Sequence, residues 1–216
     1  MKNPELREQI VDVMREMDRQ GLNHGTAGNV SHRTPEGLLI SPSGVAAPML
    51  APHMVVAVDA AGDWGGSFAP SSEWAMHRDI LAARPDVQAV VHCHSRFATT
   101  LACMGRTIPP LHYMTVITGH DEIPLAPYAT FGSEALARGV VETLGDGFGC
   151  LMANHGQIAV APDLPQALAI ATEIEQQATY YHGALAAGGP VTLTDEQMAD
   201  VRGRFATYGQ KPDPTG

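Results

Sequence analysis

The sequence is poor in cysteine, in basic residues and in long apolar runs, and each shortage excludes a class of protein. Its 3 cysteines are widely spaced and form no C-x-x-C pair, which argues against a disulfide framework and against a thiolate zinc cluster. No stretch is apolar for long enough to cross a bilayer, and the charged N-terminal segment is unlike a signal peptide. We therefore expect a cytoplasmic protein with no membrane partner.

Basic residues are outnumbered, with 13 Lys and Arg against 23 Asp and Glu, for a formal net charge of −10. Because nucleic-acid binding depends on Lys and Arg at the phosphates, we expect no nucleic-acid partner. Only 17% of the 216 residues are charged and 44% are hydrophobic, which is typical of a folded protein rather than a disordered chain. A small phosphorylated ligand stays compatible with this charge, since backbone N–H groups, hydroxyls and a divalent cation can bind phosphate locally.

The interleaving of helical and strand patterns predicts one α/β domain over residues 1–208, followed by a C-terminal tail at 209–216 that we expect to be flexible. Helical signals cover about 4–20, 70–84, 96–104, 133–144, 163–187 and the segment after Thr194. Strand signals cover 38–40, 54–58, 89–91, 150–153 and 158–160. The expected caps are Asn3, Ser133 and Thr194, and two glycines at 188–189 end the longest helix.

The segment His92-Cys93-His94 is the first candidate for chemistry. Side chains alternate between the faces of a strand, so His92 and His94 point the same way and Cys93 points into the opposite layer. Two imidazoles on one side of a rigid strand form half of a metal site. His155, in a break between two strand patterns, is the best candidate for a third ligand, and Glu73 for a carboxylate.

Spacing along the sequence does not exclude other metal ligands. His77 lies one helical turn after Glu73 and forms a competing Glu/His pair. The cluster His120-Asp121-Glu122 also has ligand chemistry, although a polar turn explains it as well. Glu73 itself, at an expected helix start, has a purely structural alternative in complementing the helix dipole.

Three further segments are rich in glycine or hydroxyl groups and lie at expected turns or helix starts. Backbone N–H groups in such places form anion-binding nests, and turn formation alone would also explain them. The first lacks the G-K-[ST] ending of a P-loop. The segments are GTAGN (25–29), SPSG (41–44) and PSS (70–72).

The order of these motifs along the chain resembles that of the class II aldolase/adducin family, most strongly its members that cleave L-fuculose 1-phosphate. The resemblance covers almost the whole chain, and its ordered matches are jointly specific. They are GTAGNVS (25–31), SPSG (41–44), SSEW (71–74), VVHCHS (90–95), HYM (112–114), IPLAPYATFGS (123–133), NHGQIA (154–159) and ATYG (206–209).

The resemblance implies an α/β/α fold with a central, largely antiparallel sheet flanked by helices, and a homotetramer with active sites between subunits. It implies that His92, His94 and His155 bind one Zn²⁺ per subunit, with Mn²⁺ or Co²⁺ able to replace it. Glu73 would be a further ligand in the free enzyme and a proton-transferring base once substrate displaces it. Three imidazoles and an exchangeable position are typical of a catalytic zinc site.

The same resemblance assigns roles to the remaining site residues. Tyr113 would reach across from a neighbouring subunit and act as the acid toward the aldehyde oxygen. Phe131 and Tyr208 would line the aldehyde pocket. The phosphate pocket would consist of Gly28, Asn29, Ser43, Gly44, Ser71 and Ser72.

The implied activity is reversible cleavage of a ketose 1-phosphate to dihydroxyacetone phosphate and a small aldehyde. The implied substrates are L-fuculose 1-phosphate, 5-deoxyribulose 1-phosphate and 5-methylthioribulose 1-phosphate. Pentulose-phosphate 4-epimerases of the family are the first alternative, although they usually carry aspartate where this chain has Glu73. Methylthioribulose-1-phosphate dehydratases and decarboxylases share the metal triad and are further alternatives. An adducin-like interaction module would not need the histidines.

Overall fold

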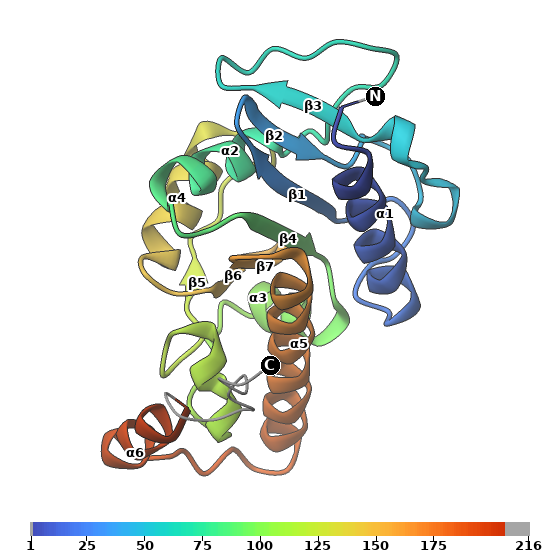
Figure 1. The fold of residues 1–216 in the computed structure, drawn as a ribbon. Coiled ribbons are helices and arrows are strands. Elements are labelled where there is room, and N and C mark those ends of the chain that lie inside the picture. Colours follow the sequence, from blue (N-terminus) through green and yellow to red (C-terminus); the bar gives the residue numbers. More distant parts are fainter. Residues whose placement is uncertain (1, 206–216) are drawn as a thin grey trace, which may run out of the picture.

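A seven-stranded sheet forms the centre of the computed structural model, which describes residues 2–205 (Figure 1). Its strand order is β3-β2-β1-β4-β7-β6-β5. Every neighbouring pair is antiparallel except β5 and β6. The strands are β1 (Asn29–Thr34), β2 (Gly37–Ile40), β3 (Val56–Asp59), β4 (Ala89–Cys93), β5 (Leu125–Ala126), β6 (Gly149–Met152) and β7 (Gly156–Ala161). The predicted α/β class with a largely antiparallel sheet is confirmed.

Helices cover both faces of this sheet, so that the molecule has three layers (Figure 1). One face packs against α1 (Pro4–Arg19), α3 (Arg96–Cys103) and α5 (Leu164–Ala186), and the other against α2 (Trp74–Ala83) and α4 (Glu134–Leu144). A 3-10 helix, η3 (Tyr113–Thr118), lies with α6 (Asp195–Phe205) at the end of α5 farthest from β1–β3 (Figure 1). Two short 3-10 turns, η1 (Ala47–Met49) and η2 (Pro52–Met54), precede β3.

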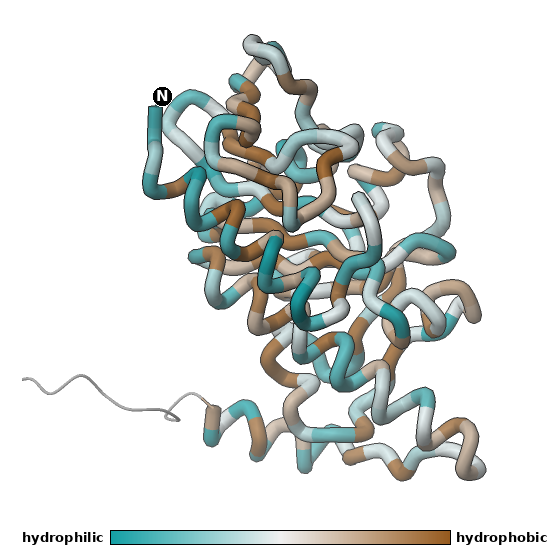
Figure 2. Tube along the Cα trace, turned by 90° about the vertical axis from the view of Figure 1, so that its right-hand side faces the viewer, coloured by the Kyte–Doolittle hydropathy of each residue, from teal (hydrophilic) through white to brown (hydrophobic). Residues whose placement is uncertain are grey.

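The alternation of side chains along β4 builds both cores. Val91 and Cys93 are fully buried in the core beneath α1, α3 and α5, whereas Val90 is buried in the core beneath α2 and α4. His92 has the same parity as Val90 and therefore lies on the α2 side. The hydropathy colouring shows that hydrophobic and hydrophilic residues also alternate along α1, as expected of a helix with one buried face (Figure 2). The expectation that Cys93 points away from the histidines is confirmed.

Most predicted helix ends are confirmed, and one is wrong. Ser133 accepts a hydrogen bond from the backbone of Leu136, and Thr194 and Gln197 cap each other reciprocally. Asn3 occupies the predicted cap position of α1 but makes no side-chain cap bond. α2 begins at Trp74 rather than at residue 70, because residues 69–71 are extended and bond to residues 41–43.

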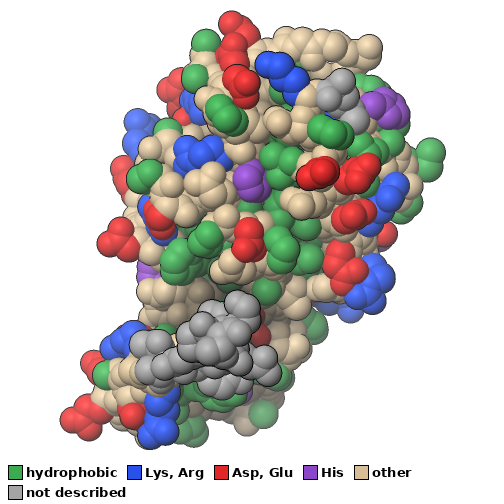
Figure 3. Space-filling model, viewed as in Figure 1, with side chains coloured by type: hydrophobic (Ala, Val, Ile, Leu, Met, Phe, Trp, Pro, Cys, Tyr) green, Lys and Arg blue, Asp and Glu red, His purple; other side chains and the backbone are tan. Residues whose placement is uncertain are grey.

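Both signs of charge are present on the face shown in Figure 3. Acidic side chains lie among Lys and Arg over most of it, and several acidic side chains gather on its right-hand side. Within residues 2–205, no helix combines the length and the apolar character needed to cross a membrane. The predicted tail at 209–216 lies outside the described residues.

Candidate active site

Three histidines from two adjacent strands converge on one point. His92 lies on β4, His94 lies one residue beyond its end, and His155 lies in the turn between β6 and β7. Because β4 pairs with β7, with Cys93 opposite Gln157, this turn stands beside the end of β4. Ring centroids of the three imidazoles are 4.8, 4.9 and 5.0 Å apart, and their ligand nitrogens lie within 4.8 Å of one another.

Hydrogen bonding orients the ring of His92 so that Nε2 faces the cluster. His92 Nδ1 is 2.8 Å from the carbonyl oxygen of Gln157, which can only accept, so Nδ1 carries a proton. His92 Nε2 then faces His94 Nε2 at 3.0 Å. Two nitrogen lone pairs at that distance repel each other unless a proton or a metal ion lies between them. Burial, then the neighbouring His92 and His155, lower the pKa of His94 to about 4, which keeps it in the neutral form that binds metals.

Glu73 adds a buried carboxylate to the histidine cluster. Its Oε2 is 3.1 Å from His92 Nε2, and its Oε1 is 3.1 Å from His155 Nε2. Asn29 donates its side-chain amide to Oε2 at 2.9 Å. Burial would raise the pKa of the Glu73 carboxyl, but the two imidazoles outweigh burial and hold that pKa well below its usual range. The same carboxylate offsets the effect of burial on His92 and raises the pKa of that histidine.

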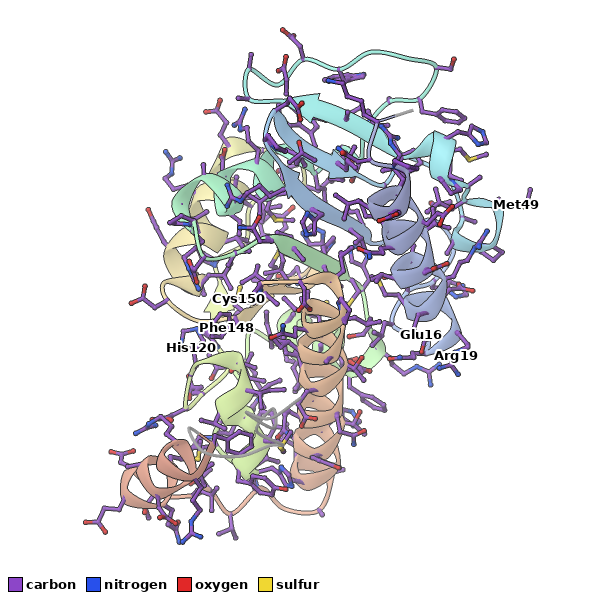
Figure 4. All side chains as sticks on the ribbon, in the orientation of Figure 1. Glu16, Arg19, Met49, His120, Phe148 and Cys150 are labelled. Carbon is purple, nitrogen blue, oxygen red and sulfur yellow. The ribbon has the colours of Figure 1, made fainter. Side chains whose placement is uncertain are left out.

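The competing ligand candidates lie elsewhere. His77 is fully buried and bonds through Nδ1 to the hydroxyl of Ser31 at 2.7 Å, and burial lowers its pKa to about 3. His120 lies near the start of β5 rather than in the triad, and Figure 4 shows it near Phe148 and Cys150. Asp121 pairs with Arg202 of α6. The geometry therefore selects Glu73, with the three histidines, as the residues that meet.

A pocket of about 420 Å³ opens beside this cluster, and all three hydroxyl- and glycine-rich segments line it. The second and third meet because backbone bonds join Ser43 N–H to Ala69 and Ser71 N–H to Ser41, at 3.0 and 3.1 Å. The first lies beside them because Ser41 N–H bonds to the carbonyl of Val30 at 3.0 Å. The structure thus brings together the six residues predicted to bind phosphate. The lining residues are Thr26, Ala27, Gly28, Asn29, Pro42, Ser43, Gly44, Ser71, Ser72, Glu73, His94, Tyr128, Ala129, Phe131, Asn154 and His155.

Glycine is required where β7 starts beside the cluster. A Cβ atom on Gly156 would lie 2.5 Å from the carbonyl oxygen of Cys93 and 3.0 Å from Cδ2 of His94. The neighbouring Asn154 has a left-handed backbone with φ of 54°, a conformation that asparagine tolerates better than most residues. The Asn-His-Gly turn therefore lets two strands approach closely while aiming His155 at the site.

Comparison with known sequences places the whole site within one family. The family described as Class II Aldolase and Adducin N-terminal domain matches residues 8–182. The chain belongs to this family. The family is metal-dependent, and the cluster of His92, His94 and His155 is the candidate metal site in this member.

Relatives of this family align with the chain over nearly its full length. A 5-methylthioribulose-1-phosphate/5-deoxyribulose-1-phosphate aldolase of Rhodospirillum rubrum is 45% identical over 97% of this chain and 96% of its own. An L-fuculose phosphate aldolase of Escherichia coli is 42% identical over 97% of this chain and 98% of its own. A solved structure described as L-fuculose 1-phosphate aldolase superposes with a TM-score of 0.91 at 32% identity, covering 95% of this chain and 98% of that one.

Of the three residues predicted for the aldehyde end, the two that the structure describes lie in different places. Phe131 lines the pocket and is 67% exposed. Tyr113 does not line it. This tyrosine is 48% exposed on η3, stacks on His112 with centroids 4.5 Å apart, and borders a separate cavity of about 640 Å³ against α6. Tyr208 lies outside the described residues.

Sequence reasoning did not single out Tyr128 or Gln157. Tyr128 lines the pocket and is 65% exposed, and its spacing of three residues from Phe131 in a glycine-ended loop was the available signal. Gln157 binds His92 through its backbone carbonyl, which carries no signature of residue type.

Proposed function

We propose that this protein is a Zn²⁺-dependent aldolase that reversibly cleaves a ketose 1-phosphate into dihydroxyacetone phosphate and a small aldehyde. The observation that carries the proposal is the arrangement of the 420 Å³ pocket. Glu73, His94 and His155 line it, with His92 in contact with them, and the rest of its wall holds three loops of small, hydroxyl-bearing residues. A metal-binding group and an anion-binding group thus face one substrate-sized space.

The donor set fits a zinc ion. His92, His94 and His155 would be its permanent ligands, and Glu73 would complete the site until substrate displaces it. Three imidazoles and one exchangeable ligand are typical of catalytic zinc, and Mn²⁺ or Co²⁺ would be able to replace it. When bound, the metal supplies Lewis-acid stabilisation of the negative charge that develops on the substrate oxygens as the carbon–carbon bond breaks.

The three loops would bind the phosphate group. Gly28 and Gly44 line the pocket and have left-handed backbones, with φ of 76° and 70°, a conformation that is typical of backbone N–H nests for anions. Ser43 and Ser72 are exposed hydroxyls on this wall, whereas Ser71 is buried and accepts a bond from the Glu73 N–H. Anchoring the phosphate here would hold the reacting carbons beside the histidines.

Glu73 would move the proton at carbon. Its lowered pKa keeps it ionised at neutral pH, and Asn29 and two imidazoles hold both of its oxygens. In the condensation direction, this carboxylate would accept a proton from the carbon beside the carbonyl of dihydroxyacetone phosphate. In the cleavage direction, it would return that proton to the enediolate.

Tyr113 would act from a neighbouring subunit of a homotetramer. Its phenol is on a half-exposed ring outside the pocket of its own chain, which suits a group that serves the pocket of another copy. There it would protonate the aldehyde oxygen in the condensation direction, and in cleavage its phenolate would accept the proton from the hydroxyl that becomes the aldehyde carbonyl. Phe131, with Tyr208, would contact the aldehyde end. The relatives named above make L-fuculose, 5-deoxyribulose and 5-methylthioribulose 1-phosphates the substrates to test.

The test is to incubate the Zn²⁺-loaded protein with each of these three ketose phosphates and to measure released dihydroxyacetone phosphate. We expect release from at least one of them, and release at least about 10²-fold slower from a Glu73→Gln control that retains the metal. Absence of release from all three, with zinc bound, would contradict the proposal. Loss of water, or inversion at one carbon without release, would instead indicate the dehydratase or the epimerase.

A further inference from the structure

The end of β4 leaves His94 without the support that fixes His92. β4 ends at Cys93, so His94 lies one residue beyond the strand ladder. Its backbone N–H has a contact of 3.4 Å to the side-chain oxygen of Asn23. A metal ligand functions only if it is held within about 0.5 Å of its productive position, by packing and by hydrogen bonds from surrounding groups. The residues after His94 show how this is achieved.

The first turn of α3 is capped by a residue from another helix. Ser95 occupies the cap position, yet its hydroxyl makes no cap bond. Instead, Glu175 of α5 accepts hydrogen bonds from the backbone N–H groups of Phe97 and Ala98, at 2.8 and 2.9 Å. A carboxylate at a helix N-terminus is electrostatically favourable. The start of α3, and with it the backbone just after His94, is therefore tied to α5, which lies beside α3 in Figure 1.

The hydroxyl of Ser95 is then available to Gln157. The fully buried side-chain amide of Gln157 donates to Ser95 Oγ at 2.7 Å and to the carbonyl of Ala171 on α5 at 3.1 Å. Because a carbonyl can only accept, the amide nitrogen must be on this side. The backbone carbonyl of the same residue accepts from His92 Nδ1. One glutamine thus contacts the ring of one histidine and the residue that follows the other.

We propose that Gln157 and Glu175 are positioning residues for the metal ligands. With Ser95 they form a clamp that joins β7 and α5 to the end of β4, fixing the ring of His92 and the backbone at His94. The clamp acts through the histidines and touches no substrate. It rests on the proposed function only in that the histidine cluster is a metal site.

The test compares metal affinity in matched variants. Glu175→Gln removes the charge and one of the two acceptor oxygens, and Glu173→Gln makes the same change on the same helix, where the side chain contacts Gln177 and not α3. Zn²⁺ affinity would be measured by competition with a chromophoric chelator, and apo-protein stability by thermal unfolding. We expect Glu175→Gln to bind Zn²⁺ about 10-fold more weakly, in line with losses of outer ligand contacts, and Glu173→Gln to match the wild type.

A second variant tests the clamp if Glu175→Gln fails to fold. Ser95→Ala removes the acceptor of Gln157 and leaves the Glu175 cap intact, so we expect a smaller loss of Zn²⁺ affinity. The visible spectrum of the Co²⁺-loaded protein should change in both variants, since it reports ligand geometry. Unchanged affinity and spectrum with lowered apo stability would overturn the clamp and leave the proposed function standing. A wild-type protein that binds no Zn²⁺ would overturn both.

Discussion

The pocket region and the η3–α6 region differ in how far one chain completes them. At the pocket, Glu73 and His92 are buried, and Glu73 bonds to Asn29 from another segment. At η3, Tyr113 is half exposed, and its ring contacts those of His112 and Phe205. The first region is organised within a single chain. The second region leaves Tyr113, a candidate catalytic residue, half exposed at the surface.

This difference separates two kinds of contribution to one reaction. Groups that bear or stabilise charge near a metal must be preorganised, because a mobile charged group would be stabilised by surrounding water instead of by the site. The phenol proposed to exchange a proton with the aldehyde oxygen carries no permanent charge, so a neighbouring subunit would be able to supply it. We expect substitutions in the pocket to act within their own subunit and substitutions at η3 to act on another.

The largest effect should come from removing a histidine of the cluster. His94→Ala leaves two imidazoles and should abolish tight Zn²⁺ binding. Aldolase activity should fall by at least about 10³-fold, because the Lewis-acid contribution amounts to several kcal/mol. Zinc content by atomic absorption and dihydroxyacetone phosphate release would be measured together. His120→Ala is the matched control. Zinc retained by the His94 variant would place the metal elsewhere, and activity retained by a zinc-free variant would contradict a metal-dependent reaction.

Glu73→Gln should have the next largest effect. The amide fills the same space but cannot accept the proton from carbon, so we expect kcat to fall by about 10² to 10⁴-fold. Exchange of the dihydroxyacetone phosphate carbon-bound proton with D₂O, followed by NMR, isolates this step from cleavage. Normal exchange in a variant that binds zinc would assign the base role to another residue.

Tyr113→Phe tests the comparison directly. Loss of the acid should lower kcat by about 10²-fold, the lower end for proton transfer by a positioned side chain. Co-refolding this variant with Glu73→Gln should restore activity in about a quarter of the sites, since random mixing pairs an intact Glu73 with an intact Tyr113 in a symmetric oligomer. A mixture no more active than its parts would mean that each chain uses its own Tyr113.

The smallest effect should come from the phosphate wall. Ser72 is exposed at the pocket, so Ser72→Ala should leave stability unchanged. Losing one hydrogen bond to a charged group should raise KM about 10-fold or more, with kcat little changed. Ser67→Ala, on a loop outside the pocket, is the control. An unchanged KM for every phosphorylated substrate would remove Ser72 from the phosphate site.

Local sequence patterns predicted the parts of this architecture that depend on neighbouring residues. Strand alternation separated His92 from Cys93, and the caps at Ser133 and Thr194 follow from short-range hydrogen bonds. Spacing could not choose between Glu73 and His77, because the choice depends on where α2 starts. That start was wrong by several residues, since it is set by pairing between 69–71 and 41–43.

Contacts between distant segments account for what the sequence could not predict. Ser95 occupies the cap position of α3, and only the packing of α3 against α5 shows that Glu175 makes the cap bonds in its place. Tyr128 lines the pocket because of the path that its loop takes through space. The motif resemblance predicted that the three glycine- and hydroxyl-rich segments share one pocket, because ordered matches carry tertiary information that single turns lack.

The close approach at Gly156 has a consequence for how this sequence can vary. Alanine there would place a methyl group against the Cys93 carbonyl and the ring of His94, with rigid backbone on one side and a ligand on the other. Substitutions at this position would therefore disturb the site directly, whatever the stability of the rest of the fold. In a saturation library selected for activity, residue 156 should accept glycine alone, while the exposed neighbour at 154 should accept the few residues that tolerate its left-handed backbone, such as asparagine and glycine.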